Sequence, residues 1–308
     1  MAASFLALPK LAEALVGRMA IKTLYPFAAA EYKQTTPPDF FADDFIDALI
    51  QDSTASDELL DMIHHSTFPE IALNDRANRR EWFEGYLATI LQRDVRALSD
   101  LKNPQQMVAF LSLLAIRTGS MANLTAISRE LGIDFKTTEK MLMLAMNAFI
   151  IMLLQPWAQP NRLNKRFVKM PKVYFLDTNF LAFLFKQDLA TVYQQDQAFW
   201  GHFLENFVAT ELVKLASWQG WDLTYFRTTA GKEVDFVVEN GNALVGIEVK
   251  SAATVSNRLI SGLQELKAIS GKRFKRGIVL YLGKKVESLG DNCWAVPLSA
   301  FWQDPKKA

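Results

Sequence analysis

The amino-acid sequence predicts an α+β protein with more than one domain, and three observations support this. The 308 residues are 50% hydrophobic and 22% charged, an ordinary globular composition at a length that suggests two or three compact units. Short helices around a Leu-Gly-Ile turn, followed by apolar runs, indicate a winged helix-turn-helix. From about residue 201 the element order α-β-β-β-α-β predicts a single mixed α/β domain.

Composition argues against several classes of protein. The net charge is +1, so no global field draws the chain onto nucleic acid or anionic lipid. The single cysteine, Cys293, excludes an internal disulfide framework and a cysteine-based zinc site. The longest apolar stretch, 148–157, is too short to cross a bilayer, and the N-terminus lacks the basic region of a signal peptide. We therefore expect a cytoplasmic protein without a membrane segment.

Charge is unevenly distributed along this nearly neutral chain. Residues 34–75 hold ten acidic residues and no Lys or Arg, whereas residues 141–176 hold five basic residues and no acid. Such asymmetry suggests separate faces for separate partners. One hypothesis is a protein partner for the acidic segment 39–75. We expect a short amphipathic helix over 37–51, and the spacing of apolar residues predicts a longer helix over 79–101.

The helix-turn-helix prediction depends on caps and on basic residues. Gly119 and Gly132 are expected to end two helices, and Asp134 to cap the next one. Lys136 and Lys140 then lie on the face of that helix away from its apolar residues. The wing region carries five further basic residues that fit phosphate contacts: Arg162, Lys165, Arg166, Lys169 and Lys172. Winged helices also serve as protein-binding modules, so contact with DNA and contact with protein both stay open.

The stretch 231–251 concentrates charge around an Asn-Gly turn. A two-residue turn at Asn240-Gly241 pairs Glu239 with Asn242, and it sets Asp235 opposite Gly246 and Glu233 opposite Glu248. Side chains alternate between the two faces of a strand. One face is then apolar, including Val234, Phe236 and Val249, and the other carries Glu233, Asp235, Glu248 and Lys250. Gly246 is expected to leave open space beside the Asp235 carboxylate.

This face could hold a metal ion. Asp235 and Glu248 would be diagonal neighbours about 7 Å apart or less, within reach of one shared ion. Glu233, and Glu205 if its helix packs over the sheet, would complete the shell. Hard oxygen ligands suit Mg²⁺ or Mn²⁺. The ion would assist phosphodiester hydrolysis, with Lys250 orienting the water or stabilising the developing charge. The competing interpretation is a half-exposed hairpin whose acids pair with Lys250, Lys232 and Arg227.

The same residues carry a resemblance to known proteins. The pattern D-x(12)-E-x-K formed by Asp235, Glu248 and Lys250, within α-β-β-β-α-β, resembles the PD-(D/E)XK nuclease superfamily and its restriction-endonuclease-like fold. The string R-x-x-x-G-x-E-V-D, beginning at Arg227, is followed by I-E-V-K-S. It resembles the C-terminal domain of unknown function in prokaryotic AAA-type ATP-binding proteins. Further matching stretches extend this resemblance over residues 8–302. It implies a DNA-associated, Mg²⁺-dependent endonuclease-like domain, with Arg227 in a supporting role.

Members of that family normally begin with an ATPase module that contains a P-loop. None of the 14 glycines here begins the P-loop pattern G-x-x-x-x-G-K-[ST], so we expect no ATP site. The resemblance implies four parts: an ATPase remnant over 1–35, a helical linker over 36–104, a winged helix-turn-helix over 105–175 and the nuclease-like domain over 176–308. The alternative is a non-catalytic DNA-binding or regulatory module derived from such an ATPase.

Overall fold

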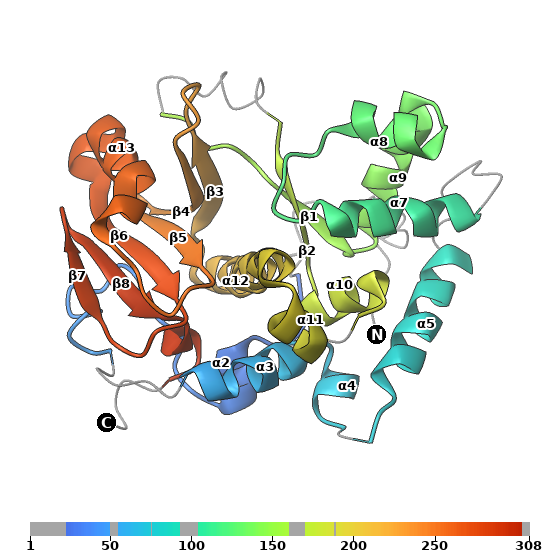
Figure 1. The fold of residues 1–308 in the computed structure, drawn as a ribbon, viewed down its shortest axis with the longest axis horizontal. Helices are drawn as coiled ribbons and strands as arrows, with labels where there is room; N and C mark the ends of the chain where they lie inside the picture. The colour runs from blue at the N-terminus through green and yellow to red at the C-terminus, as the bar shows by residue number, and fades with distance from the viewer. Residues whose placement is uncertain are drawn as a thin grey trace, which may run out of the picture.

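The protein has an α+β fold, seen in a computed structural model that describes residues 23–49, 55–74, 76–92, 104–159, 170–187 and 189–303 (Figure 1). Most of the expected 1–35 remnant lies outside the described residues. So do four of the five basic residues of the wing region: Arg162, Lys165, Arg166 and Lys169. No helix in the described part of the chain is both long and apolar enough to span a membrane.

The N-terminal part is helical. Its helices are α2 (Ala29–Lys33), α3 (Ala55–His65), α4 (Pro69–Ala72) and α5 (Arg79–Ile90). The expected helix over 37–51 is wrong, because the described residues 40–49 form turns. Phe40 and Phe45 in these turns are buried. The apolar residues of this segment therefore pack into the core from turns rather than from one face of a helix. The helix predicted from residue 79 does begin at Arg79, where the Asn78 side chain accepts a hydrogen bond from Glu81 N–H.

Three helices and a strand pair follow: α7 (Pro104–Ile116), α8 (Leu124–Leu131), α9 (Phe135–Asn147), β1 (Ile151–Leu154) and β2 (Lys172–Phe175). The two strands are antiparallel. Gly132 ends α8 with a φ of +65°, and the Asp134 side chain accepts a hydrogen bond from Thr137 N–H, so these two expected caps are confirmed. Gly119 does not cap its helix directly, because α7 already ends at Ile116. Asp177 in turn caps α10 (Thr178–Phe185), which precedes α11 (Leu189–Gln195).

The C-terminal part is a mixed six-stranded sheet with helices on both faces. Its elements are α12 (Gln197–Gln219), β3 (Asp222–Arg227), β4 (Glu233–Asn240), β5 (Ala243–Lys250), η4 (Asn257–Ile260), α13 (Ser261–Ser270), η5 (Gly271–Arg273), β6 (Phe274–Tyr281), β7 (Glu287–Gly290), β8 (Cys293–Pro297) and η6 (Leu298–Phe301). The strand order is β3-β4-β5-β6-β8-β7, with β6 parallel to β5 and β8 and the other pairs antiparallel. The predicted order α-β-β-β-α-β is confirmed for α12 to β6, and the strands β7 and β8 were not predicted.

The hairpin of β4 and β5 has a different register from the predicted one. Asn240 pairs with Ala243, and Val237 rather than Asp235 lies opposite Gly246. The two-residue loop is therefore Gly241-Asn242. Gly241 occupies the first central position of this loop with a φ of +56°, and type II′ turns have glycine at that position. The space beside Gly246 is filled, because an added Cβ there would lie 2.7 Å from a Leu263 methyl carbon.

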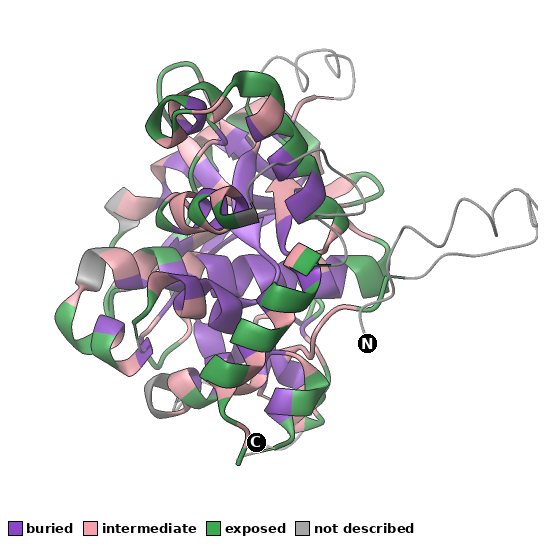
Figure 2. Cartoon of the chain, turned by 90° about the vertical axis from the view of Figure 1, so that its right-hand side faces the viewer, coloured by how far each residue is buried: buried purple, intermediate pink, exposed green. Residues whose placement is uncertain are grey.

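One buried cluster runs from the N-terminal helices through the strand pair to the α12 face of the sheet, and it includes Phe83, Tyr174, Phe207 and Val245. A second cluster lies on the α13 face and includes Val237 and Leu263. Figure 2 shows the buried residues running through the centre of the molecule. The predicted parts of the chain thus share one core, which lets residues from different parts meet at one site.

Candidate functional site

An irregularity in β4 positions Asp235. Thr224 of β3 pairs with Val237, but Phe226 pairs with Val234, so Tyr225 faces both Asp235 and Phe236. This is the arrangement of a β-bulge, which turns side chains away from strict alternation. Tyr225 exchanges backbone hydrogen bonds outside the sheet, accepting from Trp157 N–H (2.6 Å) and donating to Gln155 (3.0 Å).

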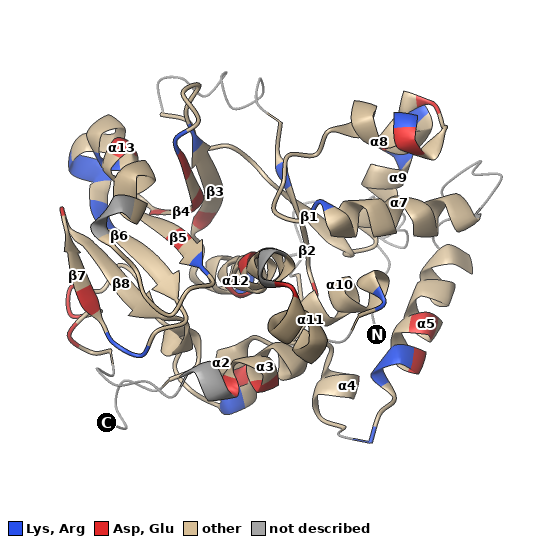
Figure 3. Cartoon of the chain, viewed as in Figure 1, with Lys and Arg blue, Asp and Glu red and all other residues tan. Residues whose placement is uncertain are grey.

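The bulge overturns the predicted assignment of faces. Val234 packs in the α13-side cluster, although alternation placed it with Phe236, which packs on the α12 side. The Asp235 carboxylate accepts a hydrogen bond from Val249 N–H at 2.9 Å. Charged residues of β2, β4, β5 and α12 gather at the centre of the molecule in Figure 3. The bulge therefore brings Asp235 toward residues of both α12 and β5.

Lys172, at the start of β2, lies among three of the predicted carboxylates. Its Nζ is 2.6 Å from Glu233 Oε1, 3.3 Å from Glu205 Oε1 and 3.7 Å from Asp235 Oδ1. Only 5% of its side chain is exposed, and the ammonium also lies 5.6 Å from the centre of the Tyr225 ring. We call Lys172, Glu205, Glu233 and Asp235 the carboxylate cluster. Arg227 contacts its rim, with a guanidinium nitrogen 3.2 Å from Glu233 Oε2.

Glu205 reaches the cluster from α12 and is held there by residues of the preceding part of the chain. The Tyr174 hydroxyl donates to Glu205 Oε1 at 2.6 Å. Gly119 lies against the same carboxylate, since a Cβ built on it would be 3.1 Å from Glu205 Oε1. Gly119 N–H also donates a hydrogen bond to the carbonyl of Val173 in β2. Gly119 and Tyr174, the two residues that contact Glu205, are therefore held together through β2. The helix that carries Glu205 packs over the sheet, which is the condition on which Glu205 was expected to reach the site.

Glu248 and Lys250 form a second pair on β5. Lys250 Nζ lies 2.9 Å from Glu248 Oε1. The other oxygen, Oε2, is buried and has no hydrogen-bond partner among the residues that the structure describes. A buried oxygen without a donor is costly, so this atom fits either a proton or a bound cation.

Burial and a neighbouring charge raise the pKa of two glutamates in the site. Burial and the negative charge of Asp235 raise the pKa of Glu205 to about 7, against the opposing effects of Lys172 and Tyr174. Burial and Asp235 likewise raise the pKa of Glu248 to about 8, against Lys250. Burial acts to lower the pKa of Lys172, but the surrounding carboxylates outweigh it and raise that pKa above its ordinary range. The site thus has an excess of carboxylates and holds protons near neutral pH.

These residues fit a metal ion in part. Mg²⁺ keeps several waters and often uses only one or two protein carboxylates, which Asp235 and the unpartnered oxygen of Glu248 could supply. Within the described ranges, no group of three or more His, Cys, Asp or Glu residues is arranged to hold a metal ion. The sequence suggested four carboxylates around one ion, but Glu205 and Glu233 contact Lys172 instead.

The sequence missed Lys172 and Tyr174. Lys172 is one of the five basic residues expected to contact phosphate, but it is buried among carboxylates, so that prediction is wrong for this residue. Lys136 and Lys140 are exposed on α9, as expected. Part of the acidic segment binds within the chain, where Asp43 Oδ1 lies 2.7 Å from Lys275 Nζ. No sequence signal linked Lys172 to the acids, because they meet only through long-range packing.

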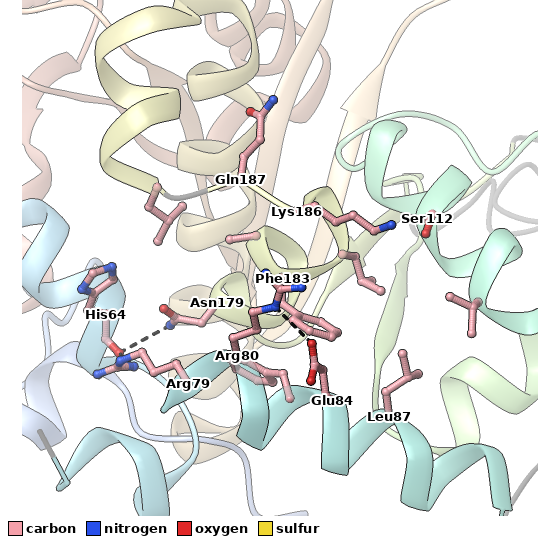
Figure 4. A pocket seen from close by; sticks show the side chains of 15 residues that line it. His64, Arg79, Arg80, Glu84, Leu87, Ser112, Asn179, Phe183, Lys186 and Gln187 are labelled. Carbon is pink, nitrogen blue, oxygen red and sulfur yellow. Dashed lines mark hydrogen bonds and ion pairs between the residues drawn. The ribbon is translucent and has the colours of Figure 1, made fainter. Parts of the chain in front are cut away.

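A separate pocket of about 440 Å³ lies among the N-terminal helices and α10 (Figure 4). Part of its polar lining is engaged within the chain, with Asn179 Nδ2 2.7 Å from the Ile63 carbonyl and Arg80 paired with Glu84 at 3.0 Å. None of the residues predicted for the metal or phosphodiester site lines this pocket. The carboxylate cluster therefore remains the candidate functional site.

Comparisons with known proteins reach both parts of the chain. A model described as "Domain of unknown function (DUF8612)" matches residues 56–191, and one described as "Domain of unknown function (DUF4143)" matches residues 200–301. The second match covers Glu205, Asp235 and Glu248, whereas Lys172 lies in the first.

Two curated relatives each align over 231 residues at 26% identity: "Uncharacterized protein Rv2008c" of Mycobacterium tuberculosis and "Uncharacterized protein Mb2031c" of Mycobacterium bovis. The alignment covers 74% of this chain and 50% of each relative. No solved structure matches the chain significantly. The chain thus resembles domains of unknown function and spans about half the length of the curated relatives it matches.

Proposed function

We propose that the C-terminal part is a nuclease-like domain of restriction-endonuclease-like fold that hydrolyses phosphodiester bonds in DNA with Mg²⁺ or Mn²⁺. The observation that carries the proposal is the bulge, which brings Asp235 beside the Glu248–Lys250 pair. The order α12-β3-β4-β5-α13-β6 supports the fold, because it combines an antiparallel hairpin with a parallel crossover, as the resemblance implies.

The proposed chemistry assigns a role to each residue. Asp235 and Glu248 would hold the ion, which would polarise a phosphoryl oxygen and lower the pKa of a bound water. Lys250, whose side chain is 29% exposed, would stabilise negative charge that develops on the phosphate. Arg227 would keep Glu233 in place through their ion pair. We propose no ATP site, because the sequence contains no P-loop.

DNA would reach this site through a winged helix-turn-helix formed by α7, α8, α9, β1 and β2. The three helices and the antiparallel strand pair support this assignment, and Lys136 and Lys140 are exposed on the helix that would enter the groove. Exposed Met143 and Phe135 on the same helix are also suited to contact with protein.

The direct test is cleavage of plasmid and branched DNA by the purified chain with Mn²⁺, compared with EDTA. We expect cleavage that requires the metal and that Asp235→Asn abolishes. If no DNA form is cut, or if the variant cuts as well as the wild type, the nuclease proposal is wrong.

A second candidate is a non-catalytic DNA-binding or regulatory module. It is favoured by the position of Lys172, whose ammonium already satisfies Glu233 and faces Glu205. This candidate predicts salt-sensitive DNA binding without cleavage, and the same assay separates the two functions.

A further inference from the structure

The carboxylate cluster contains a lysine where the sequence led us to expect a metal ion. We propose that Lys172 is a tethered counter-ion that competes with a divalent metal ion for the carboxylates of the cluster. Metal would then bind to all of these carboxylates only when the ammonium withdraws. This inference rests on the proposed metal site, and its tests measure binding and chemical reactivity rather than cleavage.

The contacts of the ammonium leave little room for a second cation. Lys172 Nζ is within 4 Å of Glu205, Glu233 and Asp235. In the described part of the chain, Lys172 supplies the only ion pair of Glu205 and of Asp235. A divalent ion bound to Asp235 at about 2.1 Å would come close to this ammonium, and the two like charges would repel each other in a poorly solvated site.

The excess of carboxylates explains why an additional positive charge would be accepted. Lys172 brings one positive charge to three carboxylates, and Arg227 contacts Glu233 through the other oxygen of that carboxylate, Oε2. Glu248, across from the cluster on β5, keeps a buried oxygen without a partner among the described residues. A divalent ion brings twice the charge of the ammonium and can bind both Asp235 and Glu248, so it is a better match once the lysine has left.

The position of Lys172 in the fold makes its withdrawal feasible. It is the first residue of β2, which pairs with β1 and lies outside the six-stranded sheet that carries Glu233 and Asp235. A lysine head group on a flexible four-carbon stem can move without any change in that sheet. Lys250 differs, because it ends a strand of the six-stranded sheet itself and forms an ion pair with Glu248 of the same strand.

The first test compares Mn²⁺ affinity by isothermal titration calorimetry in the wild type, Lys172→Met and Lys172→Arg. We expect Lys172→Met to bind Mn²⁺ at least about tenfold more tightly, because the competing charge is gone, and Lys172→Arg to show no gain. The matched control is Lys214→Met. Lys214 is also buried and lies 2.9 Å from a glutamate, Glu211, within α12, and its loss should leave Mn²⁺ affinity unchanged.

The second test uses the unaltered protein and so does not depend on whether a variant folds. Lysine acylation, followed by mass spectrometry, should be slow at Lys172 in EDTA and several-fold faster at saturating Mn²⁺, with Lys214 as the internal control. An unchanged rate at Lys172 with Mn²⁺ bound would overturn the inference.

The outcomes separate this inference from the proposed function. Equal Mn²⁺ affinity in the wild type and Lys172→Met would rule out the counter-ion role and would still be compatible with a metal-dependent nuclease. Tighter binding in Lys172→Met without any DNA cleavage supports the counter-ion role and removes the nuclease. Absence of Mn²⁺ binding in both the wild type and Lys172→Met would rule out the counter-ion role and the metal-dependent nuclease.

Discussion

The ammonium of Lys172 lies 2.6 Å from the carboxylate of Glu233, although the two residues belong to different sheets. This contact joins the strand pair β1–β2 to the acidic hairpin of the C-terminal part. A buried ion pair contributes little net stability, but removing one partner leaves an uncompensated charge. The same contact therefore couples the stability of the protein to the charge of its candidate site.

Asp235→Asn should reduce metal-dependent cleavage by about 100-fold or more, because it removes a proposed direct ligand of the ion. Rates of plasmid nicking with Mn²⁺ measure the effect. Asp222→Asn is the matched control, since Asp222 is an exposed residue at the start of β3. Equal loss of activity in both variants would indicate general damage rather than loss of a ligand.

Without metal, stability should fall as the pH rises through the neutral range. The pKa values of Glu205 and Glu248 are raised from 4.5 to about 7 and about 8, so the folded protein keeps protons that the unfolded chain has released. The resulting stabilisation is complete below about pH 4.5 and is lost as the pH rises through these folded-state values, a change of up to a few kcal/mol.

Thermal unfolding in EDTA between about pH 5.5 and 8.5 measures this dependence. Glu248→Gln should flatten the curve, because the amide cannot titrate. Glu287→Gln, at an exposed position in β7, should not. A melting temperature that rises with pH in the wild type would contradict the raised pKa values.

Much of the C-terminal fold could be predicted from the sequence, because its hydrophobic pattern is local. Apolar runs and the turn at Gly241 indicate the hairpin. In the preceding part of the chain, Asp134 is likewise recognisable as a helix cap from its neighbours alone. The predicted register of the hairpin was wrong. Asn240-Gly241 and Gly241-Asn242 are both acceptable turns, and a shift by one turn position changes every cross-strand pair by two residues.

The geometry of the candidate site depended on distant contacts and could not be predicted. The irregularity at Asp235 accompanies the bonds of Tyr225 to Gln155 and Trp157, which lie far from β4 in the sequence. The burial of Lys172 depends on packing between β2 and α12. A lysine in a basic stretch is normally solvated, so local pattern favoured a phosphate contact for this residue.

Gly119→Ala should destabilise the protein by about 2–3 kcal/mol. Its φ of +74° disfavours any side chain, and the new Cβ would lie 3.1 Å from a carboxylate that Lys172 and Tyr174 hold in place. Gly132→Ala is the control. It has a φ of +65° with nothing within 4 Å, so it should cost only the backbone strain of about 1–2 kcal/mol. Urea denaturation measures both values. Equal costs would mean that Gly119 and Glu205 are not in close contact.

Tyr174→Phe should lower stability by about 1.5–3 kcal/mol at a pH where Glu205 is ionised, because it removes a hydrogen bond to a charged group. The hydroxyl donates to Glu205 at 2.6 Å and opposes the rise of its pKa, so the variant should also raise that pKa further. Unfolding at several pH values checks both effects. Tyr193→Phe, in α11 with its ring against Trp200, should leave the pH dependence unchanged.

Lys136→Ala and Lys140→Ala should each weaken DNA binding if α9 is a DNA-contacting helix. Loss of one phosphate contact reduces the slope of log affinity against log salt by about 1 and acts similarly on all DNA sequences. Fluorescence anisotropy with a labelled duplex over a range of salt concentrations measures this slope.

The control is Lys284→Ala, an exposed lysine between β6 and β7. An unchanged slope in the α9 variants would favour a protein-binding role for this helix, where Phe135 and Met143 are also exposed. That outcome would remove α9 as the route of DNA to the carboxylate cluster, and it would count against DNA binding through α9 in both candidate functions.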